Sequence, residues 1–203
     1  MRGCCDQTAK IPLVTPTEWA LCPHPSQHSN VPAPRVTLSA HAHGLSLVFA
    51  LPDVRGLALP ASGLRGAADG LWQHTCFECF VGVAGERTYA EFNASPSLPE
   101  GQWAHYRFSD ERQRDAQPST TALHPRSHLK GNGLRLSLDL PWSVLPDPQQ
   151  PWDLGLSTVT ESQDGQITHW ALRHERAQAD FHHRASWMRI AAPWPTPTPT
   201  PTP

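Results

Sequence analysis

Short segments of alternating apolar and polar residues recur along this sequence, and no amphipathic helix of three or more turns interrupts them. The clearest segment is 134–140, where every second residue is leucine and the residues between are polar. Side chains of an extended strand alternate between its two faces, so this pattern predicts strands with one buried face. Turn-forming residues separate the segments, as in the Gly-Asn-Gly sequence at 131–133. The sequence therefore predicts an all-β protein, an antiparallel jelly-roll-like β-sandwich.

The predicted strands are short and numerous, and together they suit one domain. They cover 18–22, 35–41, 45–51, 75–83, 88–95, 102–108, 120–123, 127–130, 134–140, 154–161, 166–172 and 186–191. A chain of 203 residues is long enough for a single sandwich with a real core. We expect this domain at 11–192, preceded by a flexible N-terminus at 1–10. A disordered Thr-Pro tail is expected at 193–203, because the repeat favours an extended polyproline helix and has nothing to pack against.

Charge and hydropathy exclude two classes of partner. The formal net charge is −2, and acidic and basic residues are dispersed rather than clustered. A nucleic-acid or anionic-membrane partner would require a clustered basic surface. No segment reaches the roughly 18–20 apolar residues of a membrane span, and no apolar run suggests a signal peptide. We therefore expect a soluble, cytoplasmic protein, and we leave its oligomeric state open.

Three consecutive predicted strands carry polar groups that we expect on one side of a sheet. In 75–83, Glu78 faces away from its apolar neighbours, and in 88–95 Glu91 and Asn93 do the same. In 102–108 the alternation places Trp103, His105 and Arg107 on one side, opposite Ala104, Tyr106 and Phe108. Assigned by polarity, the set with Trp103 and Arg107 joins the face of Glu78, Glu91 and Asn93. This predicts the lining of a site for a small polar ligand.

Sugar recognition is the chemistry that these residue types suit best. Flat aromatic rings stack on the C–H faces of a sugar, while carboxylates, amides and guanidinium groups bind its hydroxyls. A second group, His174, Asp180, His182 and His183, follows near the C-terminus, and His74 is expected nearby. The candidate ligand-binding residues are Trp72, His74, Glu78, Glu91, Asn93, Trp103, Arg107, Trp170, His174 and His182. The plainer alternative is that the charged groups pair across an exposed sheet and the tryptophans serve packing.

Metal and thiol chemistry are not expected. Neighbouring residues of a strand point in opposite directions, so His182 and His183 do not grip one ion together, and a metal needs three or four converging ligands. Cys76 and Cys79 are three apart on a predicted strand and so face opposite sides, which favours two structural thiols over a redox or zinc pair. Nucleophile-elbow, phosphate-loop and dinucleotide motifs are absent from the sequence.

Five blocks of the sequence carry a family resemblance. They are DGLWQHTCFE at 69–78, EFNASP at 91–96, WAHYRF at 103–108, WALRH at 170–174 and DFHH at 180–183. In order and spacing they resemble the DOMON-like proteins of the type 9 carbohydrate-binding-module group, over most of 11–192. The resemblance implies a jelly-roll β-sandwich. It implies no defined activity, because the wider superfamily includes both sugar-binding modules and haem-binding cytochrome domains.

We accordingly expect a module that binds a small polar ligand, a saccharide, without turnover and without a cofactor. One alternative is a non-covalent haem domain with a His/His ligand pair, since the only internal methionine is Met188. The other is a glycoside hydrolase that uses Glu78 and Glu91 as paired carboxylates. A purely structural role is the remaining possibility.

Overall fold

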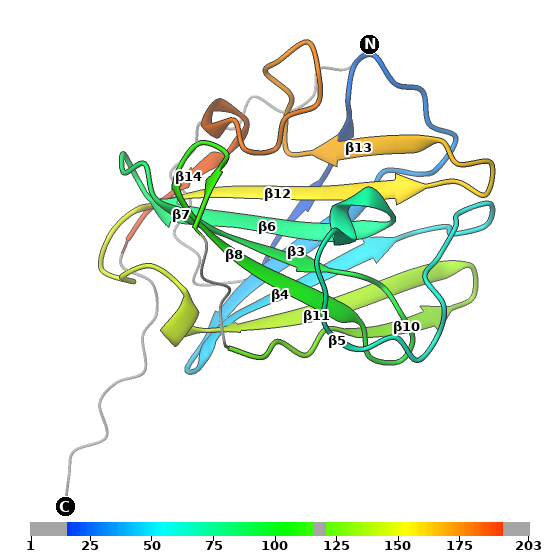
Figure 1. Cartoon of the computed structure of the whole chain (residues 1–203), viewed down its shortest axis with the longest axis horizontal. Helices are drawn as coiled ribbons and strands as arrows, with labels where there is room; N and C mark the ends of the chain where they lie inside the picture. Colours follow the sequence, from blue (N-terminus) through cyan, green and yellow to red (C-terminus); the bar gives the residue numbers. More distant parts are fainter. Residues whose placement is uncertain (1–15, 116–120, 193–203) are drawn as a thin grey trace, which may run out of the picture.

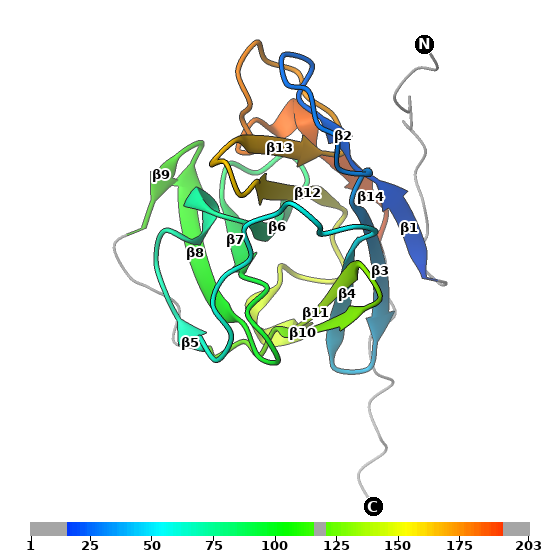
Figure 2. The same ribbon diagram turned by 90° about the vertical axis from the view of Figure 1, so that its right-hand side faces the viewer.

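The computed structural model describes residues 16–115 and 121–192, and these form two antiparallel sheets packed face to face. In Figure 1 most strands run across the view, and in Figure 2, after a quarter turn, the two layers are seen from the ends of the strands. The expected antiparallel β-sandwich is confirmed. The predicted flexible terminus at 1–10 and the Thr-Pro tail at 193–203 lie outside the described residues. None of the helices in the described ranges has the length and apolar character that crossing a membrane requires.

The smaller sheet has five strands, and its order mixes early and late parts of the chain. From edge to edge the strands are β1 (Thr17–Ala20), β3 (Arg35–His41), β4 (Gly44–Leu51), β11 (Gly133–Pro141) and β10 (Arg126–Lys130). Each neighbouring pair is antiparallel. All five overlap strands predicted from sequence, and alternation is the basis for β3, β4 and β11.

The larger sheet has nine strands and carries the central segment of the sequence. Its main path is β2 (Cys22–Pro23), β13 (Ile167–Ala171), β12 (Trp152–Glu161), β6 (Cys76–Val83), β7 (Tyr89–Ala94), β8 (Gln102–Asp110) and β5 (Gly66–Ala67). Off this path, β14 (Met188–Ile190) pairs with β12 and β9 (Gln113–Arg114) pairs with β8. Only the β5–β8 pair is parallel among the described strands.

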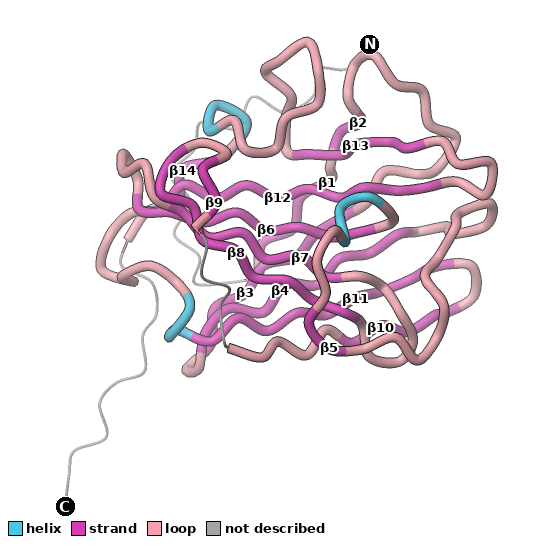
Figure 3. The backbone as a smooth tube through the Cα atoms, in the orientation of Figure 1, coloured by secondary structure: helices cyan, strands magenta, loops and turns pink. Residues whose placement is uncertain are grey.

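Within 16–115 and 121–192, helical structure is limited to single 3₁₀ turns, drawn in cyan in Figure 3. They are η1 (Leu71–Gln73), η2 (Trp142–Val144) and η3 (Arg184–Ser186). The strands missed by sequence, β2, β5 and β9, have two residues each and are too short for any alternation to be visible. The strand predicted at 120–123 does not form over its described part, 121–123.

The main core lies between the two sheets and follows directly from alternation. The four leucines of β11 are fully buried, and so are Phe77, Cys79 and Val81 of β6. Phe49 of β4 meets Phe77 across the interface, with ring centroids 5.1 Å apart. Because side chains alternate, the residues between these on β6 and β7 must point to the outer face of the larger sheet.

That outer face carries a second apolar layer, which includes Phe80, Tyr89, Tyr106, Phe108 and Trp187. Trp187 ends a segment that crosses the sheet at 173–187, which we call the strap. A Cβ at Gly155 of β12 would lie 2.6 Å from the indole nitrogen of Trp187, so only glycine lets the indole lie flat on the sheet at this point. The strap is therefore held against the same face to which the polar groups of β6 and β7 point.

One buried residue of the core is a histidine whose ring has no polar partner. His105 of β8 is 3% exposed, stacks on Phe92 at 4.4 Å, and neither ring nitrogen has a hydrogen-bond partner among the described residues. Burial, and secondarily Arg107, lowers the pKa of His105 to about 4, so the ring is neutral at pH 7.

We expect His105→Phe to raise the free energy of unfolding by about 1–2 kcal/mol, because a buried polar group without a partner is costly. The difference in stability between His105→Phe and the original protein should increase as the pH falls from 6.5 towards about 4. In this range His105 binds a proton in the unfolded chain but not in the folded protein, so the original protein loses stability. Urea unfolding at several pH values measures both effects. His128→Phe, at an exposed position of β10, is the control and should give no gain. A loss of stability in His105→Phe would show that the imidazole nitrogens are satisfied.

Candidate functional site

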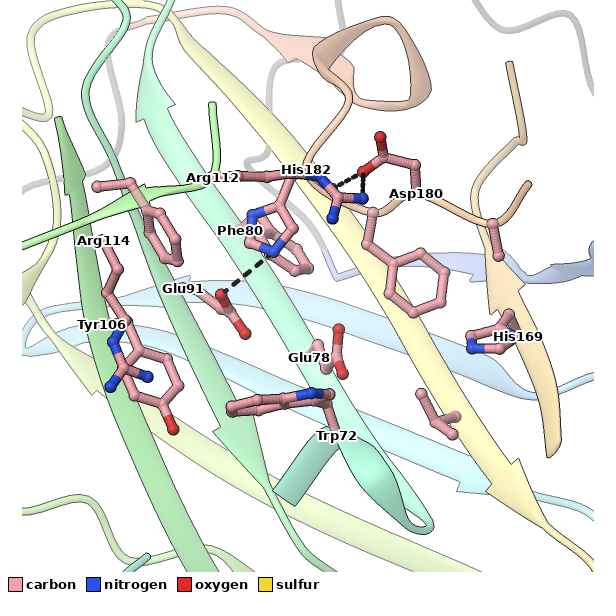
Figure 4. A pocket seen from close by; sticks show the side chains of 14 residues that line it. Trp72, Glu78, Phe80, Glu91, Tyr106, Arg112, Arg114, His169, Asp180 and His182 are labelled. Carbon is pink, nitrogen blue, oxygen red and sulfur yellow. Dashed lines mark hydrogen bonds and ion pairs between the residues drawn. The ribbon is translucent and has the colours of Figure 1, made fainter. Parts of the chain in front are cut away.

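A pocket of about 350 Å³ opens on the outer face of the larger sheet, between the sheet, η1, β9 and the strap (Figure 4). Strands β6, β7 and β8 form its floor, and the surrounding segments form its walls. The lining residues are Trp72, Glu78, Phe80, Glu91, Tyr106, Phe108, Arg112, Arg114, Val159, His169, Ala179, Asp180, Phe181 and His182.

The strand register explains why the floor residues gather. Glu91 is paired with Phe80 on β6 and with Tyr106 on β8, and directly paired residues share a face of a sheet. Glu78 is paired with Asn93 on β7 and with Ser157 on β12. Two carboxyl groups on neighbouring strands therefore point the same way, into a cavity floored by aromatic rings.

Glu78 is the more deeply buried of the two acids, with 2% of its surface exposed. The Ser157 hydroxyl donates to Glu78 Oε2 over 3.1 Å, whereas Oε1 has no hydrogen-bond partner among the described residues. Burial, and then repulsion from Glu91, raises the pKa of Glu78 well above its usual range. Burial therefore favours the neutral form of Glu78, and Oε1 is the carboxyl oxygen that a ligand would contact.

Glu91 is 5% exposed and is oriented from behind by an amide. Asn93 Nδ2 donates to Glu91 Oε1 over 2.7 Å, while Glu91 Oε2 lies 3.9 Å from Nε2 of His182. Burial raises the pKa of Glu91 to about 7 despite the hydrogen bond from Asn93. The carboxyl of Glu91 therefore changes its charge near neutral pH.

His182 reaches the pocket from the strap and is neutral there. Its Nδ1 shares a 2.8 Å hydrogen bond with the Tyr89 hydroxyl. Burial, and then the charge of Arg112, lowers the pKa of His182 to about 4, although Asp180 acts in the opposite direction. The contact between His182 and Glu91 is consequently not an ion pair at pH 7.

The cations at the rim already have partners. Arg112 pairs with Asp180 at 2.9 Å, and Arg114 pairs with Asp69 at 3.2 Å. The Arg114 guanidinium also lies over the Tyr106 ring, 4.4 Å from its centroid, and the Tyr106 hydroxyl donates to Asp69. The rim is therefore a network of charge pairs around an acidic interior.

An exposed indole provides the stacking surface. Trp72 of η1 is 40% exposed, unusual for so large an apolar side chain, and its ring meets that of Tyr106 edge-on at 5.9 Å. Figure 4 shows the indole beside the two acids. An aromatic plane next to hydrogen-bonding oxygens is the combination that a sugar ring uses.

The structure brings together half of the residues predicted from sequence. Trp72, Glu78, Glu91 and His182 line one pocket, and Asn93 supports Glu91 from below.

The expectation that Trp103 and Arg107 share the face of Glu91 is wrong. Trp103 is paired with Ala94 and Arg107 with Ala90, both of which face the core, so Trp103 packs inside and Arg107 emerges on the opposite side of the sheet. Tyr106 and Phe108, which were placed on the apolar side, line the pocket instead.

Three further predicted residues lie outside the pocket lining. Trp170 is on the core face of β13, where its indole nitrogen donates to Thr160 Oγ1 over 2.9 Å. His174 bonds the Cys22 carbonyl through Nε2 at 3.1 Å. His74 Nδ1 lies 2.8 Å from Glu161 Oε2, and His74 borders a separate hollow of about 470 Å³ beyond η1.

Several lining residues were not predicted from sequence. Register alone reveals Tyr106, because it pairs with Glu91, and His169, because it pairs with Val159 on β12. Arg112 lies in the turn before β9 and Arg114 ends this two-residue strand, so no periodicity indicates the direction of either side chain.

The structure also places the thiols and the potential metal ligands. Cys76 and Cys79 are free and buried on opposite faces of β6, one in the outer apolar layer and one in the main core, and burial raises the pKa of both thiols. Within 16–115 and 121–192, no group of three His, Cys, Asp or Glu side chains is arranged to hold a metal ion.

Fold and pocket together define an antiparallel β-sandwich with an acidic, aromatic-walled cavity on the outer face of its larger sheet. No protein-family model matches the sequence, and a comparison with curated proteins finds no match either. Solved structures do match in fold. One is a crystal structure of a protein from Bacteroides uniformis ATCC 8492, described as a candidate carbohydrate-binding protein, with TM-score 0.66 and 14% identity over 86% of this chain and 85% of that chain.

Two other matches are structures of a family 9 carbohydrate-binding module from Caldicellulosiruptor kristjanssonii. The complex with cellotriose has TM-score 0.53 and 14% identity over 85% of this chain and 80% of that chain. The complex with glucose has TM-score 0.53 and 13% identity over 88% of this chain and 84% of that chain. At these identities the matches show the shared fold.

Proposed function

We propose that this β-sandwich binds a small saccharide in the pocket above β6, β7 and β8, without chemical turnover. The observation that carries the proposal is the buried carboxyl of Glu78, which lines the same cavity as the exposed indole of Trp72 and whose Oε1 has no hydrogen-bond partner among the described residues. The fold matches support it, because they include a carbohydrate-binding module in complex with glucose and with cellotriose.

The pocket supplies both kinds of contact that a sugar requires. Glu78 Oε1 and Glu91 Oε2 are free to interact with hydroxyl groups, and an unsatisfied buried acceptor costs about 1–3 kcal/mol that such a contact relieves. Trp72 and Tyr106 offer ring surfaces at the side of the cavity. A volume of about 350 Å³ lies at the lower end of the usual range for small-molecule pockets, which suits one or two sugar units.

Isothermal titration against a panel of monosaccharides and short glucans tests the proposal. We expect Trp72→Ala and Glu91→Ala to weaken binding about tenfold or more, through loss of stacking and of a buried hydrogen bond. Arg107→Ala and His74→Ala are the controls, because both residues lie outside the pocket, and they should leave affinity unchanged. An empty panel, or an Arg107→Ala effect as large as that of Glu91→Ala, would contradict the proposal.

One observation favours glycoside hydrolysis as a second candidate. Glu78 and Glu91 line one cavity from neighbouring strands, and a glycosidase uses two carboxyl groups facing one bond. Hydrolysis of aryl glycosides by the purified protein, abolished by Glu78→Gln, would support this activity. Saccharide binding with no hydrolysis would leave the binding proposal standing alone.

Haem binding remains the other prediction from sequence. Its ligands would come from His169 and His182, since Met188 lies on β14 and does not line the pocket. A Soret band after incubation with haem, lost in His182→Ala, would support it, and no band would exclude it.

A further inference from the structure

We propose that the preferred ligand is positively charged: a hexosamine, whose free amino group binds between Glu78 and Glu91. This inference rests on the proposed function and narrows the class of saccharide. Its basis is a pair of buried acids that have no cationic partner among the described residues.

The two acids lack a cationic partner of their own. Each accepts one hydrogen bond from a neutral side chain, Glu78 from Ser157 and Glu91 from Asn93. Among residues 16–115 and 121–192, no arginine or lysine forms an ion pair with either carboxyl, and the histidine beside Glu91 is neutral. Buried carboxylates are normally paired with a cation, because an unpaired buried charge is strongly disfavoured.

The rim arginines do not supply that charge. Arg112 is paired with Asp180, which also lies 3.6 Å from Arg176, and Arg114 is paired with Asp69. Arg114 lowers the pKa of Glu91 and Asp69 raises it, so the two partners act on Glu91 in opposite directions. Burial without a cation favours the protonated form of each acid, and the pKa values of Glu78 and Glu91 are both raised for this reason.

An ammonium group would complete this arrangement. It carries several donors and no acceptor, which matches the free oxygens Glu78 Oε1 and Glu91 Oε2, and such charge-assisted bonds are about twice as strong as neutral ones. The cavity is also walled by aromatic rings, whose faces attract cations. Those rings are Trp72, Phe80, Tyr106, Phe108 and Phe181.

The same arrangement sets an order among sugars. A neutral hexose gains stacking and hydrogen bonds but brings no cation beside which the acids can ionise. A uronic acid adds a third carboxylate to a site that already disfavours two. We therefore expect hexosamines to bind most tightly, then neutral hexoses, then uronic acids.

Titration calorimetry with glucosamine, galactosamine and mannosamine against the matching hexoses and glucuronate tests this order, in mildly acidic buffer where the sugar amine is protonated. The best hexosamine should bind about tenfold or more tighter than its neutral hexose. N-acetylation removes the charge and should remove the advantage. Buffers of different ionisation enthalpy should reveal proton release on hexosamine binding, because the acids ionise beside the ammonium group.

Variants that remove one carboxyl charge test whether Glu78 and Glu91 cause the preference for hexosamines. Glu91→Gln and Glu78→Gln keep the side-chain shape and should each abolish most of the preference for the hexosamine. Glu86→Gln, at an exposed position of the β6–β7 loop, should leave every affinity unchanged. Thermal unfolding of each variant confirms that it is folded before titration.

The outcomes separate the two proposals. If hexoses bind and hexosamines bind no tighter, or if the preference survives both Gln variants, the charge inference is overturned and saccharide binding stands. If neither hexoses nor hexosamines bind, both are overturned.

Discussion

Replacing Trp187 by alanine should lower the free energy of unfolding by about 3–5 kcal/mol and should abolish ligand binding. The indole is 3% exposed and packs on Phe80 and Tyr89, with ring centroids 5.7 and 5.2 Å away. Its nitrogen donates to the Phe181 carbonyl over 2.7 Å. Its loss therefore removes a large buried surface and also frees the strap segment that brings His182 to the pocket.

Urea unfolding gives the stability change, and calorimetric titration of a bound sugar gives the affinity. Trp142→Ala is the matched control, because this half-buried tryptophan packs at 6.3 Å from Trp152, away from the pocket. It should reduce stability with affinity unchanged. Trp187→Phe keeps part of the packing and provides a folded variant if alanine is too disruptive. If a folded Trp187 variant bound the sugar with full affinity, the proposal that Trp187 holds the strap and His182 at the pocket would be contradicted.

The second large effect is a dependence of stability on pH that Glu91→Gln should remove. Burial raises the pKa of Glu91 from 4.5 to about 7, so between these values the unfolded chain releases a proton that the folded protein retains. Stability therefore falls as pH rises through this window. The loss amounts to roughly 3 kcal/mol at 1.36 kcal/mol per pKa unit, and it persists above pH 7.

The measurement is a series of urea unfolding curves for both proteins. The stability of Glu91→Gln relative to the original protein should rise from pH 4.5 to about 7 and then level off. Below that window the glutamine variant should show no gain, because Glu91 is protonated in both states. The exposed Glu86→Gln substitution should give a flat difference across the range. A flat difference for Glu91→Gln as well would mean that Glu91 is ionised in the folded protein throughout.

Alternation was sufficient to predict the sandwich, all three floor strands and the facing of two of them. On β6 and β7 the apolar residues occupy one face and the acids the other, so polarity assigns Glu78, Glu91 and Asn93 to the correct side. Leu134 and its alternate neighbours identify β11 for the same reason.

Polarity failed on β8, because both faces of that strand carry aromatic residues. One face presents Trp103, His105 and Arg107 and the other presents Tyr106 and Phe108, so hydropathy does not tell inside from outside. Pairing with β7 decides the question, and register is a tertiary property.

The walls of the pocket could not be predicted from local pattern. Arg112 and Arg114 lie at a turn, and Asp180 and His182 lie in the irregular strap, where no periodicity fixes direction. His174 and Trp170 have the residue types of a site but satisfy their hydrogen bonds within the fold.

The contact of Trp187 with Gly155 also bears on how such a protein can diversify. The outer apolar layer is separated from the main core by the thickness of one sheet, and the two layers share no residue. The segment between β13 and Trp187 can therefore change in sequence, length or charge while the sandwich keeps its packing. The condition is that Trp187 and Gly155 remain, because their contact holds the segment on the sheet. A single scaffold could in this way serve as the parent of binders with different ligands.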